Sequence, residues 1–87
     1  NNEVLAKDFE GQLRQTLDNL VQMAEAAGGT LANVVKVTAF ITDLSEFPSL
    51  TRVMEEYFTK PYPARTTAGA SALARNTLVA IDAIMVI

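Results

Sequence analysis

We expect an α+β fold in which two helices pack on one face of a mixed β-sheet, and three observations predict it. Apolar residues first recur every three to four positions over residues 8–27, which is the period of an amphipathic helix. β-branched and other apolar residues then dominate two runs, 34–41 and 78–87, which is typical of strands. The full predicted order is helix–strand–helix–strand–strand, within the single small domain that 87 residues allow.

The first helix has clear start and stop signals. Asp8 can cap its first turn, because a carboxylate there accepts hydrogen bonds from otherwise unpaired backbone N–H groups. Gly28 and Gly29 can end it, since glycine adopts the left-handed conformation without a steric penalty. Between these limits the inward-facing positions are apolar: Phe9, Leu13, Leu17, Leu20, Ala24 and Ala27.

The middle of the chain predicts a strand and a second helix. After the strand at 34–41 and a short turn, either Asp43 or Ser45 can cap the helix. Pro48 suits its first turn, where the missing N–H is not needed, and we end the helix near Thr59. The inner face of the strand is predicted to hold Val35, Val37, Ala39 and Ile41. The apolar stripe of the helix is predicted to hold Leu50, Val53, Met54, Tyr57 and Phe58.

Two further strands close the chain. The first spans Ala64 to about Ser71, where Gly69 indicates a bulge or a close backbone approach. After a turn at 74–77, the most hydrophobic segment, 78–87, predicts a central strand with both faces covered. Three strands and two helices give a thin core and a bare sheet edge, so we expect a homo-oligomer.

Composition excludes several classes of chemistry. The chain has no His and no Cys, which excludes thiol nucleophiles, Cys/His zinc sites and histidine general-base catalysis. Seven basic and ten acidic residues give a net charge of −3 without a basic cluster, so we expect no nucleic-acid partner. No apolar run approaches the ~20 residues of a transmembrane helix, so we expect no membrane partner and a cytoplasmic protein.

Arg65 is the strongest candidate for a binding residue. Pro61 and Pro63 stiffen the chain before it, and Thr66 and Thr67 follow it in a predicted strand. A rigidly held guanidinium matches the two oxygens of a carboxylate, so Arg65 can anchor a carboxylate ligand. The alternative, from the residues alone, is a surface arginine that pairs with an Asp or a Glu.

The acidic candidates are Asp82 and the pair Glu55–Glu56. Asp82 lies in the most apolar strand, where burial of an unpaired carboxylate is costly. One interpretation of Asp82 is functional, as a general base or as a partner of Arg65. The other is that Asp82 points outward, on the same face of the strand as Ala80. Glu55 and Glu56 are neighbours on a helix, point about 100° apart and cannot clamp one metal ion. We interpret this pair as a solvated helix face.

Five segments taken together resemble one known family. They are RQTLDNL (14–20), EAAG (25–28), NVVKVTAFI with the following DL (33–44), PAR (63–65) and IDAI (81–84). In this order and with this secondary structure they resemble the RidA/YjgF family, the reactive intermediate deaminases, also called L-PSP endoribonucleases or translation inhibitors. The resemblance extends from about Asp8 to Val86, which is nearly the whole chain.

The resemblance implies a fold, an assembly and an activity. Members of the family have a chorismate-mutase-like α+β fold and form homotrimers with ligand clefts between subunits. They hydrolyse enamine and imine acids, such as 2-aminoacrylate, to 2-keto acids and ammonia, and they use no metal or organic cofactor. The family's ligand-binding arginine lies in the Pro-Ala-Arg motif, so the resemblance assigns the substrate carboxylate to Arg65.

The chain also departs from the family pattern. The family has an N-terminal hairpin region before the first helix, so we expect residues 1–87 to be one RidA/YjgF-like domain that is truncated at its N-terminus. Ala80 stands where active deaminases carry a glutamate that is thought to position water. Thr67 stands where a cysteine is often found, and Thr51 where an asparagine is common in the second helix.

Two functions therefore stay open. In the first, the protein is an imine or enamine hydrolase. Arg65 anchors the substrate and Thr67 helps to hold the attacking water. These groups can suffice because imine hydrolysis needs mostly orientation of the reactants and neutralisation of charge. In the second, it is a non-catalytic or weakly active, regulatory trimer that binds small carboxylates, which Ala80 favours. Asp82 and Ala80 are secondary site candidates. The acidic composition argues against a ribonuclease.

Overall fold

The structure, a computed structural model, describes residues 8–60, 62–73 and 77–86. Two helices and three strands alternate in the predicted order, with short 3₁₀ turns at Leu31–Asn33 and Leu44–Glu46. The main elements are α1 (Phe9–Ala26), β1 (Val34–Ile41), α2 (Phe47–Tyr57), β2 (Ala64–Gly69) and β3 (Val79–Met85). No helix among these residues has the length and apolar character needed to cross a membrane.

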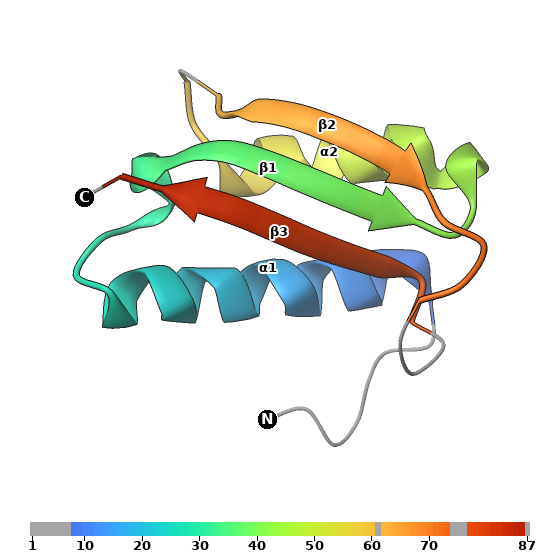
Figure 1. Cartoon of the computed structure of the whole chain (residues 1–87), viewed down its shortest axis with the longest axis horizontal. Coiled ribbons are helices and arrows are strands. Elements are labelled where there is room, and N and C mark those ends of the chain that lie inside the picture. The colour runs from blue at the N-terminus through green and yellow to red at the C-terminus, as the bar shows by residue number, and fades with distance from the viewer. Residues whose placement is uncertain (1–7, 61, 74–76, 87) are drawn as a thin grey trace.

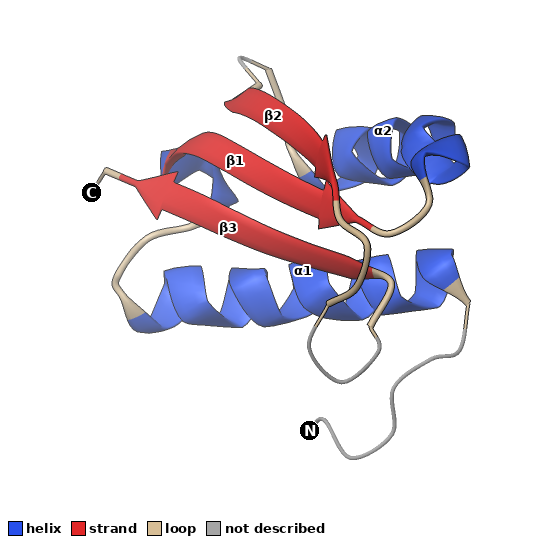
Figure 2. Cartoon of the chain, turned by 45° about the vertical axis from the view of Figure 1, so that its right-hand side comes forward, coloured by secondary structure: helices blue, strands red, loops and turns tan. Residues whose placement is uncertain are grey.

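The three strands form a mixed sheet in the order β2-β1-β3. β1 pairs in parallel with β2, and α2 provides the crossover that a parallel pair requires. β1 pairs antiparallel with β3 on its other side. Both helices lie on one side of the sheet and leave its other side open (Figures 1 and 2). The predicted α+β class, with helices on one face of a mixed sheet, is confirmed.

The hydrophobic core fills the space between the sheet and the helices. Alternate residues of β1 point into it, because successive strand side chains point to opposite faces. Leu13 and Leu17 of α1 and Leu50 and Val53 of α2 are fully buried against them. The core cluster is Phe9, Leu13, Leu17, Val34, Val37, Ala39, Ile41, Leu50, Val53, Met54, Phe58 and Val79.

The prediction that 78–87 is a central strand is wrong. β1 occupies the centre of the three-stranded sheet and β3 lies at an edge. Only the inner face of β3 packs on the core, while Ile84 on the outer face is 56% exposed. The hydrophobicity of this strand therefore reflects two apolar faces, of which the helices of the same chain cover one.

Two local predictions are also wrong. Val34 is 5% exposed and Val35 48% exposed, because the register between β1 and β3 shifts between Val34 and Lys36. This irregularity turns Val35 out of the predicted inner face. Gly69 forms neither a bulge nor a close backbone approach: its pairing with β1 is continuous, and the nearest neighbours of a Cβ there would be side-chain atoms of Leu44 at 3.5 Å.

The ends of the helices follow the sequence signals in part. The Asp8 carboxylate accepts a hydrogen bond from the Gly11 N–H (3.3 Å), and Gly28 has a φ of +89° where α1 ends, as predicted. Asp43 caps the 3₁₀ turn before α2, so the prediction that Asp43 or Ser45 caps α2 itself is wrong. The predicted turn at 74–77 lies mostly outside the described residues.

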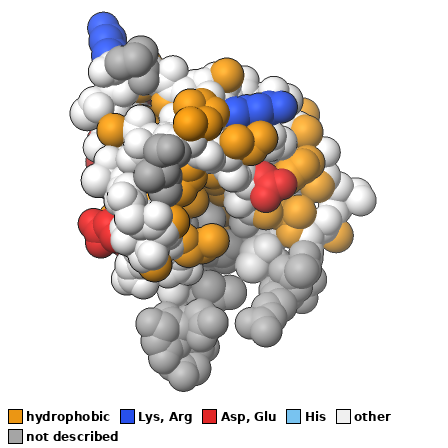
Figure 3. All heavy atoms as spheres, turned by 60° about the vertical axis from the view of Figure 1, so that its left-hand side comes forward, with side chains coloured by type: hydrophobic (Ala, Val, Ile, Leu, Met, Phe, Trp, Pro, Cys, Tyr) orange, Lys and Arg blue, Asp and Glu red, His pale blue; other side chains and the backbone are white. Residues whose placement is uncertain are grey.

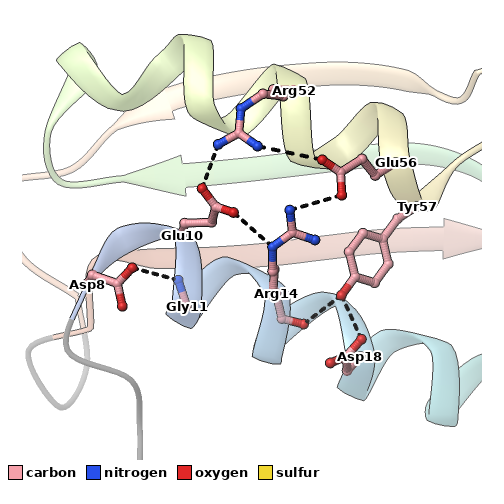
Figure 4. A network of polar contacts seen from close by, with 8 residues as sticks. All are labelled: Asp8, Glu10, Gly11, Arg14, Asp18, Arg52, Glu56 and Tyr57. Atoms are coloured by element: carbon pink, nitrogen blue, oxygen red, sulfur yellow. Dashed lines mark hydrogen bonds and ion pairs between the residues drawn. The ribbon is translucent and has the colours of Figure 1, made fainter.

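A polar network ties the two helices together (Figure 4). Arg14 of α1 contacts Glu10 at 3.0 Å and Glu56 of α2 at 2.9 Å. Arg52 of α2 contacts Glu10 at 2.5 Å and Glu56 at 3.6 Å. Two arginines and two glutamates thus alternate in the contact between α1 and α2. Glu56 forms ion pairs in this network, so it is not simply a solvated residue.

Candidate functional site

A cavity of about 300 Å³ lies between α2 and the start of β2. α2 contributes one wall, and the connection that leads from α2 to β2 contributes another. Its lining combines apolar side chains with a hydroxyl, a carboxylate and a guanidinium: Thr51, Met54, Glu55, Phe58, Tyr62, Pro63 and Arg65. A concave site with a few converging polar groups is typical of small-molecule binding.

Arg65 reaches this cavity because of the strand register. It pairs with Val37, a fully buried residue of β1, so its side chain leaves the sheet on the helix side. There its Nη2 donates a hydrogen bond to Thr51 Oγ1 (3.1 Å). The guanidinium carbon lies 5.1 Å from the centre of the Phe47 ring, which is within range of a cation–π contact. Two neighbours from α2 therefore hold the guanidinium in place.

The charge of Arg65 is not neutralised by a carboxylate of the described chain. The ion pairs among these residues use Arg14 and Arg52 instead. One hydrogen bond to Thr51 leaves most of the guanidinium N–H groups available. The alternative interpretation of Arg65, an arginine paired with Asp or Glu, does not describe its surroundings in this structure.

Thr67 lies on the same side of β2 as Arg65, two residues further on. It pairs with Ala39, which is fully buried, and its Oγ1 is buried without a hydrogen-bond partner in the described part of the chain. An unpaired buried hydroxyl is costly, so it is a favourable contact for a water molecule or a ligand atom. Thr67 does not line the cavity directly.

Asp82 and Ala80 lie on the opposite side of the sheet. Asp82 pairs with Thr38 and Ala80 with Phe40, on the face that neither α1 nor α2 covers. Asp82 is exposed and borders a separate hollow of about 380 Å³, lined by Lys36, Thr38, Asp82, Ala83 and Ile84. Within one protomer Asp82 is therefore no partner of Arg65. The alternative prediction, that Asp82 points outward from the strand, agrees with the structure.

Sequence reasoning missed Glu55 and Tyr62 as residues of the Arg65 cavity. The signal for Glu55 was its spacing. It follows Thr51 by four positions on α2, and residues four apart share a helix face. The interpretation of Glu55 and Glu56 as one solvated helix face is wrong, because Glu55 lines the cavity and Glu56 pairs with Arg14 and Arg52. No group of three or more potential metal ligands occurs among the described residues.

Comparison with known proteins identifies the family. The sequence profile of the Endoribonuclease L-PSP family matches residues 1–87. The chain belongs to this family. A member from Dermatophagoides farinae, named 2-iminobutanoate/2-iminopropanoate deaminase, is 37% identical over 86 residues, covering 99% of this chain and 67% of the relative. A RutC family protein of Pyrococcus horikoshii is 38% identical, covering 94% of this chain and 65% of the relative.

Solved structures of L-PSP family members have the same fold. The crystal structure of RidA from Psychrobacter sp. PAMC 21119 matches with a TM-score of 0.95 and 38% identity. That match covers 97% of this chain and 68% of the other. The predicted RidA/YjgF membership and chorismate-mutase-like fold are thus confirmed. The chain spans about two thirds of the length of these relatives.

Proposed function

We propose that this chain is a RidA-like hydrolase of small 2-imino and enamine acids, which releases a 2-keto acid and ammonia. The observation that carries the proposal is the guanidinium of Arg65, which faces a cavity of about 300 Å³ without a carboxylate partner in the described residues. The name of the relative from Dermatophagoides farinae, 2-iminobutanoate/2-iminopropanoate deaminase, supports the choice of substrate. Its substrates are small carboxylates, which match a site with one fixed arginine.

The proposed reaction needs little beyond orientation. Arg65 binds the substrate carboxylate through two parallel N–H···O bonds and so fixes the position of the imine carbon. A water molecule adds to that carbon, and the C=N double bond becomes a C–N single bond. A proton then passes from the new hydroxyl to nitrogen, the C–N bond breaks, and ammonia leaves the 2-keto acid. The unpaired hydroxyl of Thr67 is a candidate contact for the water.

A second function, binding of small carboxylates without catalysis, has one observation in its favour. Ala80 replaces the glutamate that the family resemblance leads one to expect, and Ala80 lies across the sheet from Arg65. A binder would keep the Arg65 anchor and show no hydrolysis above the spontaneous rate. The two functions therefore predict the same ligand and differ only in turnover.

We also propose that the protein acts as a homotrimer. The open side of the sheet carries the apolar residues Phe40, Ala80 and Ile84 next to Lys36, Thr38 and Asp82, and neither described helix covers it. Figure 3 shows one face of the molecule where hydrophobic side chains lie exposed next to acidic and basic ones. Exposed apolar side chains on a sheet face are stabilised when a second copy covers them.

Substitution of Arg65 tests the proposed ligand. We expect Arg65→Ala to abolish binding of 2-oxobutanoate, the product of 2-iminobutanoate hydrolysis, in isothermal titration calorimetry. Arg65→Lys should weaken binding at least tenfold, because an ammonium lacks the planar fork that matches a carboxylate. The matched control is Arg52→Ala, which removes an arginine of α2 that faces α1 and not the cavity.

Two further measurements complete this test. The Tm of Arg65→Ala should stay close to that of the wild type, since its contacts are one hydrogen bond and one ring contact. Turnover of 2-iminobutanoate, generated in the assay by an amino-acid oxidase, should exceed the spontaneous rate in the wild type only. Unchanged 2-oxobutanoate binding by a folded Arg65→Ala variant would contradict the proposal.

A further inference from the structure

We infer that Glu55 is the general base that holds the attacking water in the Arg65 cavity. This inference rests on the proposed function, because it assigns a role within the same reaction. Among the described residues that line the cavity, Glu55 is the one carboxylate and Arg65 the one cation. The site therefore presents opposite charges to opposite ends of a small ligand.

The Glu55 carboxylate is free to act. It makes no hydrogen bond or ion pair with the described residues, whereas its neighbour Glu56 contacts both Arg14 and Arg52. The two side chains differ because successive helix positions point about 100° apart. Glu56 thus faces α1 and serves the network between the helices, and Glu55 faces the cavity. Arg65 is also not tied to Glu55, since its hydrogen bond goes to Thr51.

The spacing along α2 suits a small imino acid. Thr51, which accepts the hydrogen bond from Arg65, precedes Glu55 by one helical turn, and such neighbours lie about 5–6 Å apart at their Cβ atoms. An imino acid bound to Arg65 by its carboxylate would direct its imine carbon and nitrogen along this turn. A water molecule that the Glu55 carboxylate holds in the same cavity would then be the one that adds to the imine carbon.

The chemistry favours a carboxylate at this end. An imine at neutral pH is attacked by water as its protonated, positively charged form, and Glu55 stabilises that charge. As the water oxygen bonds to the imine carbon, Glu55 accepts one water proton. It then gives this proton to the nitrogen of the carbinolamine, and the C–N bond breaks as the C=O bond forms. The departing ammonia takes the remaining hydroxyl proton, so the products are a 2-keto acid and an ammonium ion. Glu55 ends the cycle deprotonated, so no other reactant is needed.

The position of Ala80 adds to this assignment. Ala80 lies on the open face of the sheet, while the Arg65 side chain leaves the other face. Within one protomer no side chain at position 80 reaches the cavity. Among the described residues of the same protomer, the carboxylate placed to act on a ligand of Arg65 is therefore that of Glu55 on α2.

The experiment compares Glu55→Gln with the wild type and with Glu25→Gln. Glutamine keeps the shape of Glu55 and removes its charge, and Glu25→Gln removes the same charge from an exposed position near the end of α1. We expect Glu55→Gln to lower kcat for 2-iminobutanoate at least tenfold, within the 10²–10⁴-fold range of general acid–base assistance. Its KM and its affinity for 2-oxobutanoate should change less than threefold, and Glu55→Asp should restore part of kcat.

The possible outcomes separate this inference from the proposed function. A wild type that hydrolyses 2-iminobutanoate, with a Glu55→Gln variant within twofold of its kcat, overturns the role of Glu55 alone. A Glu55→Gln variant with tighter 2-oxobutanoate binding and higher kcat shows that Glu55 competes for Arg65, and also overturns it. A wild type that binds 2-oxobutanoate but hydrolyses nothing overturns both the deaminase and its base, and leaves the binder.

Discussion

Thr51 is the residue that sets the direction of the Arg65 guanidinium. Its hydroxyl accepts the hydrogen bond from Nη2 at 3.1 Å, and it lies in the cavity wall itself. Thr51→Val keeps the shape of the side chain and removes the acceptor. We expect it to weaken 2-oxobutanoate binding about 3–10-fold, the effect of one such hydrogen bond.

Calorimetry checks this prediction with a matched hydroxyl. Thr16→Val removes a hydroxyl that bonds only to the Gln12 carbonyl within α1, away from the cavity, so its affinity should equal that of the wild type. Equal affinities for the Thr51 and Thr16 variants would show that Phe47 alone keeps the guanidinium in place.

The sequence allowed prediction of some site residues but not of their grouping. Arg65 was recognisable from its local setting, because two prolines and a strand start are local features. Alternation correctly separated Asp82 and Ala80 from Val79 and Ile81. The register between β1, β2 and β3 decides whether Arg65 points to the side of the sheet that the helices cover. This register joins segments far apart in the sequence, so local patterns do not reveal it. Glu55 shares a helix face with Thr51, which is a local feature, but that this face meets Arg65 depends on the same non-local register.

At the scale of elements, the α1–α2 contact depends on the charge of Glu10. Arg52 first, and then Arg14, lower the pKa of Glu10 below its ordinary value of 4.5 through side-chain hydrogen bonds. A carboxyl with a lowered pKa in the folded state stabilises the fold above its unfolded pKa. This contribution is lost as the pH falls through the folded pKa.

Glu10→Gln tests this contribution. At pH 7 we expect the variant to melt about 1–4 °C below the wild type, because exposed ion pairs contribute modestly and this one belongs to a network. The difference should shrink as the pH falls through the lowered pKa of Glu10 in the folded state, and should also shrink in 1 M NaCl. Glu25→Gln is the control, with no comparable loss at pH 7. A Tm difference that does not change with pH or salt would mean that the effect is not one of charge.

At the scale of the whole molecule, the sequence predicted the layers but not the neighbours in the sheet. Helices on one face followed from amphipathic periods, which are local. β1 takes the centre because α2 carries the chain over to a parallel partner, and the third strand then pairs on the remaining edge of β1. Hydrophobicity alone pointed to 78–87 as the central strand, since it does not distinguish a strand between two neighbours from an edge strand with apolar residues on both faces.

The open sheet face yields the last prediction, which concerns assembly. Ile84 is 56% exposed there, and Phe40 and Ala80 lie on the same face. Burial of this surface in a trimer would stabilise each chain by removing apolar area from water. Light scattering at micromolar concentration should therefore give three times the mass of the chain. Ile84→Lys should shift the mass toward the monomer, whereas the control Met23→Lys, on an exposed position of α1, should not. A monomeric wild type would show that the open face is solvated and that the Arg65 cavity works within a single chain.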